Sequence, residues 1–137
     1  MRVFGLITLS AAVCFAPIAY AQSGSVDVVR VCLSTVKLVS ELSDAMELAE
    51  SDSPEQAELV YDQAISTHYD DWLVFSVVHG DEAGKVLETN SAMGAVLVVS
   101  EDCIKAKDCR FGVFDRHADE LQSKLPAACQ LDYRKVN

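Results

Sequence analysis

Residues 53–80 read SPEQAELVYDQAISTHYDDWLVFSVVHG, and their pattern is the strongest indication of the architecture. Ser53 is a good N-cap, Pro54 suits the first helical position, and Gln56 is placed to close a capping box. Apolar residues then recur at steps of three and four, the period of an α-helix, on two nearly opposite faces. A helix that is apolar on two sides is normally central in a bundle or faces a partner. The stretch therefore predicts such a helix, ended by Gly80.

The two faces of this helix carry different residues. The first face contains Ala57, Tyr61, Ala64, His68, Trp72 and Phe75. The reverse face contains Leu59, Leu73 and Val77. We expect the first face to pack into the core. The reverse face either packs against another helix of the same chain or, together with Tyr69, supplies apolar anchors for a partner or for a second copy in a homodimer.

Amphipathic segments on both sides of this stretch predict further helices. Residues 26–50 carry apolar side chains at the helical period, with Ser25 as a plausible N-cap and Asp27 at the positive end of the helix dipole. A third helix is expected from a cap at Asp81 to about Val99. Its β-branched end could form a strand instead, but no second strand-like run is evident.

The last part of the sequence predicts a loop and a short helix. Residues 110–114 look like a loop with buried phenylalanines, and Asp115 is placed to cap the helix that follows. Its inward residues are expected to be Ala118, Leu121 and Leu125, with Pro126 after its end. The expected fold is all-α, a small four-helix bundle-like domain.

The N-terminus has the layout of a cleavable secretory signal. Residues 1–2 are positively charged at the start, residues 3–16 form an apolar run, and residues 19–21 read Ala-Tyr-Ala. This pattern predicts cleavage after Ala21 and a single exported domain over residues 22–137, in the periplasm or secreted. A lipoprotein anchored through Cys14 is disfavoured, because bulky Val13 precedes the cysteine.

Cleavage would leave four of the five cysteines, an even number in a short exported chain, which favours disulfides. Among the three connectivities that four cysteines allow, we favour Cys103 with Cys109 and Cys32 with Cys129. A zinc site is disfavoured because no CxxC pair exists and the compartment is oxidising. No metal and no cofactor is expected.

Charge is the most informative feature for function. After cleavage, 21 acids stand against ten bases, a formal charge of −11, and no lysine or arginine lies between Lys37 and Lys85. The acids within that gap that span the first helical hairpin are Glu41, Asp44, Glu47, Glu50, Asp52, Glu55, Glu58 and Asp62. Such a surface repels nucleic acid and anionic lipid and attracts cationic partners. It either keeps an exported protein soluble or docks a basic protein.

Catalytic patterns are missing from the sequence. There is no GxSxG motif, no glycine-rich phosphate loop and no cysteine predicted to be free. His68 is expected to be a core residue, His79 to lie at a helix end and His117 at the surface. His68 and Asp71, three apart on one helix face, lack a third ligand for a metal at a fixed spacing. We do not expect an enzyme.

These features together predict a binding protein. A small, acidic, helical and disulfide-tied exported domain is similar in type to immunity proteins that block cell-wall-degrading toxins. We expect an inhibitor or immunity-type protein that binds a basic partner, for example a cell-wall-degrading toxin or a lytic enzyme. The expected partner-binding residues are Glu47, Glu50, Glu55, Glu58, Asp62, Leu59, Tyr69, Leu73 and Val77. Two alternatives are a carrier of small lipophilic ligands, with a cavity near Trp72, Phe75 and Met93, and an envelope stress chaperone.

Overall fold

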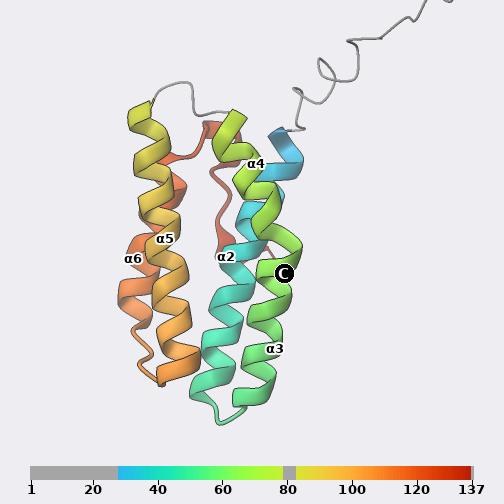
Figure 1. Ribbon diagram of the computed structural model, residues 1–137, viewed down its shortest axis with the longest axis vertical. Helices are drawn as coiled ribbons and strands as arrows, with labels where there is room; N and C mark the ends of the chain where they lie inside the picture. The colour runs from blue at the N-terminus through green and yellow to red at the C-terminus, as the bar shows by residue number, and fades with distance from the viewer. Residues whose placement is uncertain (1–27, 79–82, 137) are drawn as a thin grey trace, which may run out of the picture.

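The computed structural model describes residues 28–78 and 83–136, which form four helical rods lying side by side (Figure 1). The first rod is α2 (Val28–Glu50), and the second joins α3 (Pro54–Ala64), a π-helical turn η1 (Ile65–Tyr69) and α4 (Asp70–Val78). The third is α5 (Ala83–Ala106) and the fourth is α6 (Phe111–Lys124), followed by the 3₁₀ turns η2 (Ala127–Cys129) and η3 (Tyr133–Lys135). These residues contain no strand, and the predicted all-α fold is confirmed.

Several predicted features lie outside the described residues. They are the signal segment 1–21, Ser25, Asp27, His79, Gly80 and Asp81. The structure neither supports nor contradicts those predictions. In the two described ranges, no helix combines the length and the apolar character of a membrane span.

The turn between α2 and α3 is closed by backbone hydrogen bonds. The N–H of Ser53 donates to the carbonyl of Leu48 at 3.0 Å, and Asp52 between them has a φ of 63°. This is the geometry that ends many helices, and aspartate is one of the few residues that tolerate it. The predicted capping box is wrong: the Ser53 side chain makes no capping hydrogen bond, although Pro54 does begin α3 as predicted.

The π-helical turn is the main feature that the sequence did not reveal. Ala64, His68 and Trp72 follow one another at steps of four, and each such step drifts by about 40° around an α-helix. The wider turn over Ile65–Tyr69 takes up this drift. As a result His68, Trp72 and Phe75 all stay buried, with 9%, 2% and 3% of their surface exposed. The predicted inward face is therefore formed.

The hairpin of α5 and α6 differs from the prediction at both of its inner ends. α5 continues to Ala106, and the β-branched run 95–99 lies inside it as helix. The predicted loop over residues 110–114 is wrong, because α6 already begins at Phe111, and so Asp115 does not cap it. Burial of Phe114 inside the bundle explains the difference, since the helix must start early enough to place that ring. Phe114 is fully buried, as are nearly all atoms of Ala118 and Leu121.

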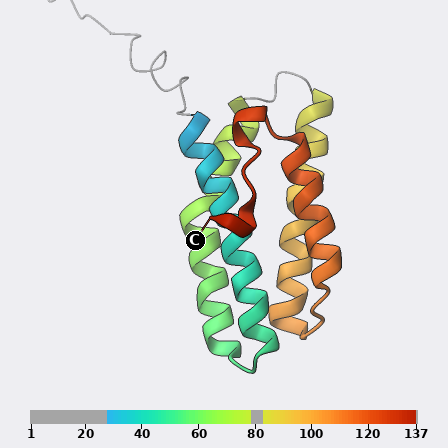
Figure 2. The same cartoon turned by 180° about the vertical axis from the view of Figure 1, so that it is seen from behind.

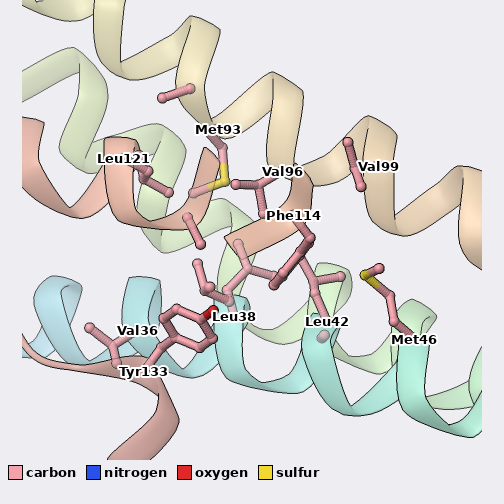
Figure 3. Packing of buried hydrophobic residues seen from close by; sticks show 14 of the residues in the cluster. Val36, Leu38, Leu42, Met46, Met93, Val96, Val99, Phe114, Leu121 and Tyr133 are labelled. Atoms are coloured by element: carbon pink, nitrogen blue, oxygen red, sulfur yellow. The ribbon is translucent and has the colours of Figure 1, made fainter. Parts of the chain in front are cut away.

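The core lies between all four rods (Figure 3). Leu38, Leu42 and Met46 of α2 meet residues from α5 and α6 across the middle of the bundle. The labelled side chains that they face are Met93, Val96, Val99, Phe114 and Leu121. Because each rod contributes side chains that have no solvent contact, the four rods form one core.

A C-terminal segment after α6 runs back over α2 and holds the bundle closed (Figure 2). Cys129 in this segment forms a disulfide with Cys32, and the Cα atoms are 4.6 Å apart. The Tyr133 ring meets Phe114 edge-on at 6.3 Å, and its hydroxyl donates to a carboxylate oxygen of Asp115. The second disulfide joins Cys103 and Cys109, so both predicted pairings are confirmed.

Candidate functional site

The turn between α2 and α3 gathers five exposed carboxylates at one end of the bundle, and we refer to them as the acidic tip. They are Glu47, Glu50, Asp52, Glu55 and Glu58. The last two turns of α2, the connecting residues and the first turns of α3 supply them, so the hairpin itself brings them together. Four of these five residues belong to the predicted partner-binding set.

The acidic tip has no basic counterpart in the described part of the chain. None of its five carboxylates lies within ion-pair distance of a lysine, arginine or histidine there. Several acids elsewhere are paired, among them Glu101 with Lys105 at 2.6 Å and Asp102 with Arg110 at 3.0 Å. The tip therefore has no ion pair of its own among the described residues, although Arg134 lines a hollow together with Glu47. Solvent, salt or a cation from outside can relieve the repulsion among its charges.

Asp62 differs from the tip residues. It is exposed on α3, but it faces the region of Lys105, whose pKa is raised first by the hydrogen bond and charge of Glu101 and to a smaller degree by Asp62. Its charge is thus partly offset from within the chain. Among the predicted acids, Asp62 is the one with a nearby base.

Most of the predicted apolar anchors are exposed. Leu59 has 56% of its surface exposed, Leu73 has 40% and Val77 has 79%, so none of the three is buried within the part of the chain that the structure describes. Tyr69 is partly buried and stacks on Trp72 with 5.8 Å between ring centroids. It therefore belongs more to the core than to the surface.

Val74 is a surface residue that the sequence did not single out. Half of its surface is exposed, and it lies between Leu73 and Val77 on α4. Its place depends on the rotation that the π-helical turn introduces before α4. The signal in the sequence was the run of large apolar residues 73–75, of which only Phe75 is buried.

A polar hollow lies beside the π-helical turn. It has a volume of about 450 Å³, and its lining residues are Lys37, Ser40, Glu41, Asp44, Thr67, His68 and Val136. Nε2 of the buried His68 lies 3.3 Å from a carboxylate oxygen of Glu41. Partial burial, and then the negative charge of Glu41, raise the pKa of Asp44. The hollow thus holds one acid, Asp44, whose charged form is disfavoured by its surroundings.

The pair considered for a metal does not form a site. His68 contacts Glu41, whereas the carboxylate of Asp71 accepts hydrogen bonds from Ser34 and Arg30, each at 2.8 Å. The hydrogen bond from Ser34, and then the interaction with Arg30, lower the pKa of Asp71. In residues 28–78 and 83–136, His, Cys, Asp and Glu nowhere form a group of three that could hold a metal.

The core residues considered for a lipophilic ligand, Trp72, Phe75 and Met93, are each at most 3% exposed. A small apolar cavity does lie between α2, α6 and the C-terminal segment, but its volume is about 10 Å³. That is room for about one water, far below the several hundred Å³ of a ligand pocket.

The surface of the first hairpin therefore gives the strongest indication of function. It combines an uncompensated acidic tip with exposed apolar side chains on the adjoining helix. Comparisons of the chain with protein-family models, with curated proteins and with solved structures find no significant match.

Proposed function

We propose that this chain is an exported binding protein, of inhibitor or immunity type, that docks a basic protein through its acidic tip. The observation that carries the proposal is the set of five exposed carboxylates without a basic partner in the described residues. A cluster of like charges destabilises the free protein slightly and gains most when a cationic surface covers it.

The placement of these charges supports association more than solubility. Charges that only keep a protein in solution work equally well when they are dispersed over the surface. Concentrated at one end of a rigid hairpin, they steer a basic partner toward one orientation and raise the association rate. The nearby Leu59, flanked on its helix by Glu55 and Asp62, supplies an apolar contact inside an acidic rim.

The compartment follows from the predicted signal and from the cysteines. Two disulfides are typical of proteins that work outside the reducing cytoplasm. With the predicted signal at residues 1–21, they favour the periplasm or the exterior. Lytic enzymes that act on an anionic cell wall are often basic, so a toxin or lytic enzyme of this kind fits the acidic tip.

The test starts from the full chain, expressed with its N-terminal segment in an exporting bacterial host. The secreted or periplasmic form serves as bait for one stoichiometric partner, and the association rate is then measured at low salt. The variant E47Q/E50Q/E55Q/E58Q should slow association about tenfold or more, because electrostatic steering depends on these charges.

A matched control changes the net charge equally but elsewhere. The variant E101Q/D102N/D108N/E120Q also removes four negative charges, all from acids that are paired with bases. Its association rate should stay within about threefold of the wild type. Equal slowing by both variants, or no slowing by the first, would overturn the proposed function.

A further inference from the structure

The outward side of the second rod presents one continuous stripe of exposed residues, which we refer to as the outer face. It is made of Glu55, Leu59, Asp62, Ser66, Asp70, Val74 and Val77, all exposed. The apolar members lie toward the two ends, and the acids lie mainly between them. At about 1.5 Å per residue, Leu59 and Val74 are separated by roughly 22 Å along the helix.

The π-helical turn sets the direction in which the α4 end of the outer face points. Five residues in a π-helix advance by about a quarter turn less than five residues in an α-helix. Without the turn over Ile65–Tyr69, Val74 would point about 60° to one side of Leu59, whereas with the turn it points within about 30° of Leu59. Val74 is thereby presented to the same side as Asp62 and Asp70, and Val77 points about a quarter turn from Leu59, at the edge of the face.

Charge decides what can cover this face. A second copy packed antiparallel on it would set acids against acids, with Asp62 of one copy near Asp70 of the other. No lysine or arginine lies in residues 38–84, and Lys105 of α5 offsets only part of the charge of Asp62. Like charges across an interface cost binding energy and suppress the pairing. A partner with bases opposite the acids gains both from charge and from burial of the apolar ends.

A helix is the shape that fits. The face belongs to an exposed helix whose residues recur at steps of three and four, and such a ridge packs into the groove of another helix. No strand edge exists in the described residues on which an extended peptide could be added. We propose that the outer face binds an amphipathic helix with apolar residues at its ends and bases between them. This inference rests on the proposed function and names the binding element of its basic partner.

The test uses a defined peptide as probe. A fluorescein-labelled peptide of 20 residues, about 30 Å as a helix, carries leucine at helical spacing and lysine between. Its binding to the full exported chain is measured by fluorescence anisotropy at low salt. A peptide of the same composition in scrambled order keeps the charge and loses the apolar face. We expect the scrambled peptide to bind at least about tenfold more weakly than the amphipathic peptide.

Variants of the protein locate the binding site. The variant L59S/V74S removes one apolar contact at each end of the outer face and should weaken binding of the amphipathic peptide about tenfold. The matched control V98S changes a side chain on α5 that is 56% exposed, as Leu59 is, and should change binding less than twofold. Circular dichroism and thermal melting confirm that both variants remain folded.

Two results would overturn the inference. One is equal binding of the scrambled and amphipathic peptides, which means that charge alone attracts them. The other is a loss of binding in the E47Q/E50Q/E55Q/E58Q variant with no effect of L59S/V74S, which places the peptide on the acidic tip. Either result leaves the proposed function standing. That proposal fails separately, if the same charge variant leaves the association rate of the full partner unchanged.

Discussion

The two helical hairpins turn at the same end of the bundle, yet their turns are built in different ways (Figure 1). The α2–α3 turn is closed by backbone hydrogen bonds and exposes acids without partners. The α5–α6 turn also has a backbone hydrogen bond, from the N–H of Asp108 to the carbonyl of Asp102 at 3.2 Å, but the Cys103–Cys109 disulfide closes it as well. Its acids pair with Lys105 and Arg110. The second turn is thus neutralised and cross-linked from within. The first leaves its charge available to something outside the chain.

The largest expected effect comes from the disulfide that joins the first rod to the C-terminal segment. Cys32 and Cys129 are 97 residues apart, so the bridge greatly restricts the unfolded chain. The variant C32A/C129A should lose about 4–5 kcal/mol of unfolding free energy. Urea denaturation without reductant, followed by circular dichroism, measures the loss.

The bridge within the second hairpin is the matching control. Cys103 and Cys109 are six residues apart, and the same chain-entropy model gives a loss of roughly 2 kcal/mol for the variant C103A/C109A. A larger loss from the short bridge than from the long one would contradict this account. It would mean that the α5–α6 turn is held chiefly by its disulfide and hardly by its ion pairs.

The difference between the hairpins was only partly visible in the sequence. Helical periodicity, Pro54 and the cysteine count predicted the helices and both disulfides, because these signals are local or follow from an even count. The gap without bases between Lys37 and Lys85 predicted where charge collects. That prediction needed only the assumption that the segment folds as a hairpin.

Features that depend on packing were missed. The π-helical turn at Ile65–Tyr69 arises because inward residues at steps of four must all reach one core, and no single residue marks it. The early start of α6 follows from the place that Phe114 takes in the bundle. The exposure of Val74 is a consequence of the π-helical turn. The periodicity of a regular α-helix therefore could not predict the outer face.

A second prediction compares the charges of the two hairpins directly. Glu47 and Glu50 lie in the last turn of α2, at the negative end of its dipole, without basic partners in the described residues. The variant E47Q/E50Q should therefore raise the unfolding free energy by about 0.5 kcal/mol at low salt. The gain should disappear at high salt, because ions screen exposed charges. Thermal and urea denaturation at two salt concentrations measure it.

The variant E101Q/D102N is the counterpart in the second hairpin. It removes the carboxylates that pair with Lys105 and Arg110, so it should lower the unfolding free energy at low salt. We thus expect the unfolding free energy to rise in E47Q/E50Q and to fall in E101Q/D102N, because the acids of the first turn have no ion pairs and those of the second do. A change of the same sign in both would remove the distinction on which the acidic tip is defined.

The smallest expected effect separates two acids of the first hairpin that have opposite surroundings. Burial and the charge of Glu41 raise the pKa of Asp44, so its ionised form costs stability at neutral pH. The variant D44N should raise the unfolding free energy at pH 7, and the gain should vanish as the pH falls through that raised pKa. Hydrogen bonds from Ser34 and Arg30 lower the pKa of Asp71, so its ionised form contributes stability. That contribution is present above the ordinary carboxylate pKa of 3.8 and is lost as the pH falls through the lowered value.

The variant D71N should accordingly lower the unfolding free energy at pH 7, with a smaller effect in acid. Both changes should stay below about 1 kcal/mol, because Asp44 is exposed and the partner of Asp71, Arg30, has 69% of its side chain exposed. Urea denaturation at pH 7, 5 and about 3 follows both variants against the wild type. If both D44N and D71N lower the unfolding free energy at pH 7, the ionised form of Asp44 also contributes stability. A cation must then lie near Asp44 when the protein is in solution. That cation would offset negative charge on the α2 surface next to the acidic tip. The net negative charge of the first hairpin would then be smaller than its contacts indicate.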